Sequence, residues 1–119
     1  MRTMKIIQKP WGTEKLVVTN EYYTGKFLNI SAGQETSKQY HKEKHETLFL
    51  LSGKAKVLLN GVEKIVDSKV DDEDARTFVI PPHTIHKTSA VDGDCVFIEF
   101  STSQLSDVIR ISDIYHRIE

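Results

Sequence analysis

The chain has little cysteine, little proline and no long apolar run. Among its 119 residues there is a single cysteine, so no disulfide can form within the chain, and we expect a reducing compartment, the cytoplasm. No apolar segment approaches the roughly 20 residues of a transmembrane helix, which argues against a membrane partner. The formal net charge is −1, from 16 basic and 17 acidic residues, and this balance argues against a nucleic-acid partner. Cys95 lies in an apolar run and is predicted to be a buried structural thiol.

Short runs rich in β-branched and aromatic residues recur between turn signals, and they indicate an all-β sandwich or barrel. The predicted strands are Lys15–Thr19, Lys26–Ser31, Thr47–Leu51, Ala55–Leu59, Val62–Val66, Thr77–Ile80, His86–Ala90 and Cys95–Ser101. Asn60-Gly61 predicts a two-residue hairpin turn, and Asp92-Gly93-Asp94 predicts a second turn. The length predicts one domain over residues 1–119, with a core at about 9–101 and a tail at 102–119. The segment Leu105–Ile118 has mixed helical and strand character and remains unassigned.

A mixed set of nitrogen and oxygen ligands is the most informative feature of the sequence. The set consists of Gln39, His41, Glu46 and His86. In an alternating strand, Gln39 and His41 point to the same face. Two imidazoles, a carboxylate and an amide oxygen suit zinc or a neighbouring first-row divalent ion. The sequence therefore predicts one divalent metal ion, with zinc as the first expectation and manganese, nickel, cobalt or iron as alternatives.

The spacing of these ligands resembles the two sequence motifs of the cupin superfamily. The first motif is present as Gly33-x5-Gln39-x-His41-x4-Glu46-x6-Gly53, in which glutamine replaces the usual first histidine. The second is looser and reads Pro81-x-His83-x2-His86, with His83 at the position of a glycine. This resemblance implies a single-domain cupin fold, a double-stranded β-helix or jelly-roll barrel. Since cupins often pair through sheet edges, it also implies a homodimer.

Further segments resemble the C-terminal cupin domain of bifunctional type II mannose-6-phosphate isomerase/mannose-1-phosphate guanylyltransferase. They are Lys9-Pro10-Trp11-Gly12, Gln39-Tyr40-His41, Ile80-Pro81-Pro82-His83-Thr84-Ile85-His86 and the tail from Asp107 to Arg117. The resemblance implies metal-dependent interconversion of an aldose phosphate and a ketose phosphate, with mannose 6-phosphate as the leading substrate.

Several other residues are candidates for contact with the substrate. His83, on the loop of the second motif, is a candidate acid or base. Glu43 is a second candidate, because it shares the inward parity of His41 if the strand continues. His45 adjoins Glu46 and is expected to point to the opposite face. The candidates for substrate or phosphate binding are Lys9, Trp11, Lys87, Arg110 and Arg117, with arginine best suited to bidentate phosphate contacts.

Several positions depart from that family's pattern, and they keep other functions open. The segment His41-Lys42-Glu43-Lys44-His45-Glu46-Thr47 replaces a histidine-rich family sequence, and Lys87 replaces an arginine. Conserving the metal residues while changing the surrounding pocket is the pattern expected if the substrate had changed. The alternatives are a non-catalytic, metal-containing cupin that binds carbohydrate, and a cupin dioxygenase. The second is less favoured because such sites usually present more histidines.

Overall fold

The structure is a computed structural model that describes residues 4–104 and 106–117. Within these residues the chain forms eleven strands and no helix, which confirms the all-β prediction. The strands are β1 (Lys5–Lys9), β2 (Gly12–Thr19), β3 (Thr24–Ile30), β4 (Lys38–Tyr40), β5 (Glu46–Ser52), β6 (Lys54–Leu59), β7 (Val62–Asp67), β8 (Thr77–Ile80), β9 (His86–Ala90), β10 (Cys95–Ser101) and β11 (Ile109–Ser112). In the part of the chain described here, no helix is long and apolar enough to cross a membrane.

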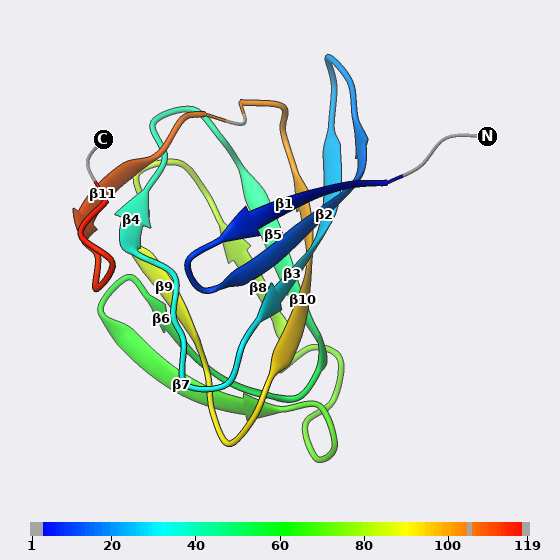
Figure 1. Cartoon of the computed structure of the whole chain (residues 1–119), viewed down its shortest axis with the longest axis vertical. Helices are drawn as coiled ribbons and strands as arrows, with labels where there is room; N and C mark the ends of the chain where they lie inside the picture. Colours follow the sequence, from blue (N-terminus) through cyan, green and yellow to red (C-terminus); the bar gives the residue numbers. More distant parts are fainter. Residues whose placement is uncertain (1–3, 105, 118–119) are drawn as a thin grey trace.

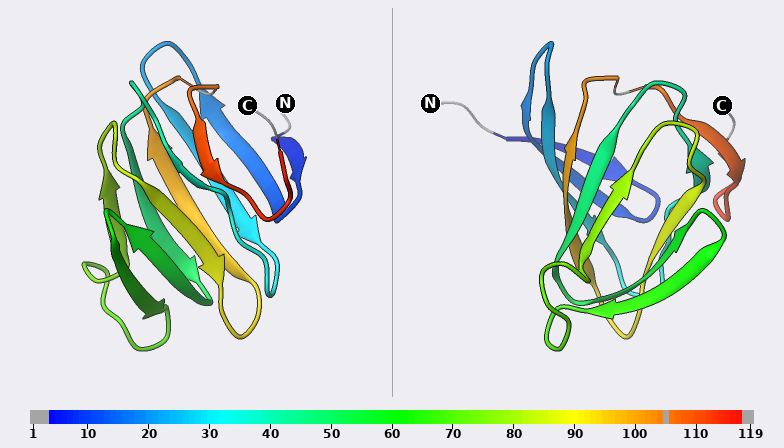
Figure 2. Two further views of the ribbon diagram at one scale, coloured as in Figure 1. Left: turned by 90° about the vertical axis from the view of Figure 1, so that its left-hand side faces the viewer. Right: turned by 180° about the vertical axis from the view of Figure 1, so that it is seen from behind.

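The strands form two antiparallel sheets that face each other (Figures 1 and 2). One sheet has six strands in the order β1-β2-β3-β10-β5-β8, and the other has five in the order β11-β4-β9-β6-β7. Neighbouring strands in each sheet come from distant parts of the sequence. For example, β10 lies between β3 and β5. This arrangement brings residues that are far apart in the sequence onto one inner surface.

The inner surface is apolar at one end of the sandwich and polar at the other. Along β10, Cys95 and Phe97 are buried at the apolar end, and Glu99 is buried at the polar end. In β3, β5 and β9, the inward-facing residues are likewise apolar at the first end of the sandwich and polar at the second. The apolar residues of the inner surface form a single core. The core residues include Leu28, Ile30, Leu48, Leu50, Ala55, Val57, Ile80 and Ala90. The fold therefore places a hydrophobic core beneath a polar cavity.

All eight strands predicted from the sequence are present, with ends shifted by a few residues in some of them. The hairpin turn between β6 and β7 has φ values of 51° at Asn60 and 82° at Gly61, the positive pair that a type I′ turn requires. Asp92 and Gly93 form the second predicted turn, also with positive φ. Burial raises the pKa of Cys95 to about 12, with a smaller effect from Asp94, so the prediction of a buried thiol is confirmed.

Three strands were not predicted: β1, β4 and β11. The strand β4 has three residues and β11 has four, which leaves too little alternation for a pattern to emerge. The unassigned segment 105–118 thus includes β11, which pairs with β4. Both ends of that segment, and the C-terminal end of the tail predicted at 102–119, lie outside the described residues.

Candidate metal centre and its cavity

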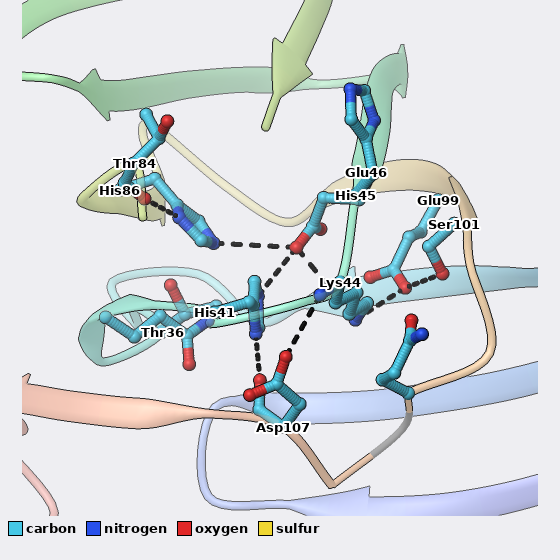
Figure 3. A network of polar contacts seen from close by, with 12 residues as sticks. Thr36, His41, Lys44, His45, Glu46, Thr84, His86, Glu99, Ser101 and Asp107 are labelled. Atoms are coloured by element: carbon cyan, nitrogen blue, oxygen red, sulfur yellow. Dashed lines mark hydrogen bonds and ion pairs between the residues drawn. The ribbon is translucent and has the colours of Figure 1, made fainter. Parts of the chain in front are cut away.

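Three of the four predicted ligands converge inside the polar end of the sandwich (Figure 3). His41, Glu46 and His86 are all buried, and each offers one ligand atom within 4.8 Å of the others. Nε2 of His41 lies 2.7 Å from Oε2 of Glu46, and Nε2 of His86 lies 3.7 Å from the same oxygen. Gln39 pairs with His86 across β4 and β9 and lines the same cavity. Its role as a fourth ligand stays a prediction.

The other ring nitrogen of each histidine faces a backbone carbonyl. Nδ1 of His41 donates to the carbonyl oxygen of Asp107, and Nδ1 of His86 donates to the carbonyl oxygen of Thr84 at 2.9 Å. In a neutral imidazole the proton is then on Nδ1, which leaves the lone pair of Nε2 directed at Glu46. Carbonyl groups that fix histidine ligands in this way are typical of metal centres.

The centre also contains two buried polar atoms without hydrogen-bond partners. Nε2 of His41 and Oε2 of Glu46 are close, but their geometry is not that of a hydrogen bond. Two facing acceptors in a buried place are costly unless a cation lies between them or beside them. The cation is either a second proton on His41 or a metal ion, and the convergence of three ligand atoms fits a metal ion. The residues present thus suit a divalent metal.

The charges around the centre keep the ligands in the protonation states that a metal needs. Burial alone would raise the pKa of Glu46, but donation from His41 when its Nε2 is protonated and the charge of Lys44 outweigh this effect and lower the pKa to about 2. Burial lowers the pKa of His86 below its ordinary value of 6.5, although Glu46 opposes this. At pH 7, Glu46 is therefore ionised and His86 is neutral.

Asp107 holds the loop that links the candidate ligands His41 and Glu46. Its carboxylate accepts hydrogen bonds from three successive backbone N–H groups, those of Lys42, Glu43 and Lys44, at 3.1, 2.7 and 3.0 Å. The N–H groups of Glu43 and Lys44 hold the pKa of the Asp107 carboxyl below its usual range. Because the carbonyl of Asp107 also orients His41, one residue of the C-terminal segment fixes both the loop and a ligand.

We expect Asp107→Asn to lower metal affinity about tenfold, which lies at the low end of the range for groups that orient metal ligands. Asparagine keeps one carbonyl acceptor, but it turns an amide N–H₂ group toward the N–H groups of the loop. Competition with a coloured chelator measures the affinity. Asp71→Asn is the matched control, because Asp71 accepts the backbone N–H of Asp67 at 2.7 Å in another loop. Equal affinities for the two variants would contradict the assigned role.

The candidate metal centre lies in a cavity of about 100 Å³, which has room for an ion together with a small ligand. Among the described residues, five cationic side chains line it, against three carboxylates. The cations are Lys9, Lys26, Lys44, Arg110 and Arg117, and the carboxylates are Glu14, Glu46 and Glu99. With a divalent ion added, the cavity favours an anionic ligand.

Four of the five residues predicted to bind substrate line this cavity: Lys9, Trp11, Arg110 and Arg117. Trp11 is also part of the hydrophobic core, with 4% of its surface exposed. Lys87 does not line the cavity. It follows His86 on β9, so strand alternation turns it to the outer face, where it forms an ion pair with Glu35 at 3.2 Å.

The two predicted acid or base residues lie outside the cavity lining. Glu43 is exposed because β4 ends at Tyr40 and a loop follows, so the strand does not continue as its inward parity required. His83 is also exposed, and its backbone has a φ of 64° at the position where the cupin motif has glycine. Its backbone N–H donates to the carbonyl of His41 at 2.7 Å. His45 is exposed, as predicted.

Sequence reasoning missed five residues at this site: Glu14, Lys26, Lys44, Glu99 and Asp107. A signal was present for two of them. In β3, Lys26 has the same parity as the apolar Leu28, and in β10, Glu99 has the same parity as Phe97. A charged residue at an inward position of a strand is a sign of a polar cavity.

A family model described as "Mannose-6-phosphate isomerase C-terminal" matches residues 1–114. The chain is also 24% identical over 116 residues to mannose-1-phosphate guanylyltransferase ManC of Salmonella typhimurium. This match covers 94% of the chain and 23% of ManC, so the chain spans about a quarter of the length of this curated relative.

Solved structures with the same fold include the capsular polysaccharide assembling protein CapF of Staphylococcus aureus. It has a TM-score of 0.78 and 15% identity, with 95% of the chain and 35% of CapF covered. An RmlC-like cupin from Shewanella frigidimarina has a TM-score of 0.71 and 16% identity, with 86% of each chain covered. At these identities the likeness shows the cupin fold.

Proposed function

Because the chain belongs to the family of mannose-6-phosphate isomerase C-terminal domains, we propose that it is a metal-dependent sugar phosphate isomerase. It would interconvert an aldose phosphate and a ketose phosphate, and mannose 6-phosphate is the first substrate to test. The observation that carries the proposal is the convergence of His41, Glu46 and His86 beside a predominantly cationic cavity. The ion would be zinc or another first-row divalent metal.

His41, Glu46 and His86, with Gln39 beside them, would hold the metal. When bound, the ion supplies Lewis-acid polarisation of sugar oxygens. The protein groups orient the sugar and keep its reacting end in a cavity with little water, where charge effects are strong. Arg110 would hold the phosphate with its planar guanidinium group.

The isomerisation also needs a general base that takes a proton from one sugar carbon and returns it to the next. Of the described residues that line the cavity, Glu14 and Glu99 are the carboxylates outside the metal set. We assign the proton transfer to one of these two. The loss of kcat at saturating sugar phosphate in Glu14→Gln or Glu99→Gln, measured with bound metal, identifies which of them acts.

The second candidate function is a metal-containing cupin that binds carbohydrate without turnover. One observation favours it: the two cavity carboxylates outside the metal set, Glu14 and Glu99, are already paired with lysines. Glu14 lies 3.1 Å from Lys26, and Glu99 lies 3.0 Å from Lys44. A carboxylate held by an ammonium group is a weaker base.

The test is an NMR assay of aldose–ketose exchange on a panel of hexose phosphates, together with the metal content of the purified protein. We expect one metal ion per chain and exchange that is lost in the double variant His41→Ala/His86→Ala. Bound metal and sugar phosphate without exchange would favour the binding function. Metal-free wild-type protein, unchanged by the double substitution, would contradict both functions.

A further inference from the structure

Six charged side chains form a row along the inner face of the six-stranded sheet, and we call this row the charge ladder. Beginning at the metal centre, the order is Glu46, Lys44, Glu99, Lys26, Glu14 and Lys9, so that acidic and basic groups alternate. Successive charged atoms are 3.9, 3.0, 3.8, 3.1 and 4.0 Å apart. All six residues line the cavity, and Figure 3 shows the part from Glu46 to Glu99.

The inner part of the ladder is deeply buried. Lys44 and Glu99 have side chains 5% and 4% exposed, and the side chain of Lys26 is 9% exposed. Buried ion pairs of this kind add little stability, because desolvation offsets their attraction, and apolar residues of similar volume are often as stable or more so. The next inward residue of β3 is Leu28, and the next in β10 is Phe97. Charges at the ladder positions are therefore better explained by a ligand than by folding.

The alternation of charges specifies the chemistry of that ligand. A hydroxyl group both donates and accepts, so neighbouring hydroxyls can each accept from a lysine and donate to a glutamate. A phosphate accepts only, and the ladder carboxylates Glu99 and Glu14 would repel it. Arg110 of β11, in the facing sheet, lines the same cavity and presents a cationic group suited to an anion. Arg117 also lines the cavity, but Asp113 holds its guanidinium at 2.7 and 3.2 Å.

We propose that four residues of the ladder form a subsite that recognises the hydroxyl groups of a polyhydroxylated ligand, such as a hexose. These residues are Lys44, Glu99, Lys26 and Glu14. This inference rests on the proposed function for the sugar as ligand, but it requires no turnover. The ladder would orient the sugar ring, while Arg110 on the facing sheet receives the phosphate. It gives the cavity two sides, one for hydroxyls and one for the anionic group.

The test is isothermal titration of the metal-loaded, full-length chain with mannose, mannose 6-phosphate and inorganic phosphate. In Glu99→Gln, we expect affinity for both sugars to fall about 10- to 100-fold, since hydrogen bonds to a charged group are lost. Affinity for inorganic phosphate should not fall, because Glu99 repels that ion, and the metal content should not change. Glu35→Gln is the matched control, because Glu35 pairs with Lys87 at 3.2 Å outside the cavity lining.

Lys26→Arg keeps the charge but changes its geometry, and it provides a second test if Glu99→Gln does not fold, as judged by NMR. We expect weaker sugar binding in this variant too. Sugar affinity equal to wild type in the folded variants would overturn the proposal. So would the absence of sugar binding by the wild-type chain with bound metal. Ladder-dependent binding without isomerisation would contradict the proposed isomerase but support the subsite.

Discussion

Replacing His41 with alanine is expected to weaken zinc binding by more than about 100-fold, because even groups that only orient metal ligands contribute 10- to 100-fold. His41 supplies one of three converging ligand atoms, and its Nε2 is buried without a hydrogen-bond partner. Since a metal that binds only the folded chain stabilises it by about 2.7 kcal/mol at 100 times Kd, the variant should also lose most of the zinc-dependent rise in Tm.

The measurements are zinc titration against a competing chelator and thermal unfolding with and without zinc. His45→Ala is the matched control, because His45 is exposed and lies next to Glu46 in the sequence. It should keep wild-type affinity and a wild-type rise in Tm. If His41→Ala retained zinc as tightly as His45→Ala, the metal would be held elsewhere.

The second large effect is expected from Gly12→Ala, with a loss of about 3 to 5 kcal/mol in the free energy of unfolding. A Cβ atom at this position would lie 1.9 Å from the carbonyl oxygen of Asn29, and the φ of Gly12 is +151°. The backbone cannot move aside easily, because the N–H of Ser31 donates to the carbonyl of Trp11 at 2.9 Å. Trp11 lines the cavity, so the substitution should also disturb the site.

Urea unfolding monitored by tryptophan fluorescence measures this loss. Gly25→Ala is the matched control, since Gly25 lies in the paired strand β3 and its added Cβ would meet a side-chain carbon of Val18 at 3.3 Å. Side chains adjust more readily than backbone, and alanine is favoured over glycine within a strand. We expect a change of less than about 1 kcal/mol there. Similar losses in both variants would contradict the steric argument.

The convergence of His41, Glu46 and His86 could be predicted from sequence because these residues are fixed by short-range spacing and by strand alternation. His41 and Glu46 are five residues apart in the sequence, and His86 begins a strand that was predicted with its observed bounds. Spacing alone cannot show that the segment with His41 and Glu46 meets the segment with His86. The resemblance to cupins supplied this expectation. The register that places Gln39 opposite His86 gives this expectation its structural basis.

The charge ladder and the role of Asp107 could not be predicted for a different reason. Lysine and glutamate in a strand normally indicate its solvent face, so Lys26 and Glu99 were not recognised as inward residues. Asp107 contacts a loop more than 60 residues away in the sequence, and such a contact leaves no local pattern. Glu43 would have pointed inward only if the strand had continued, and β4 ends at Tyr40.

The most direct test of the metal centre is a crystal structure of the zinc-loaded protein, with diffraction data recorded on both sides of the zinc absorption edge. The predicted result is one anomalous peak per chain, within about 2.0 to 2.2 Å of Nε2 of His41, Nε2 of His86 and a carboxylate oxygen of Glu46. Data on the double variant His41→Ala/His86→Ala should lack this peak. A peak at another place, such as the acidic turn Asp71–Asp74, or none in the cavity, would contradict the account.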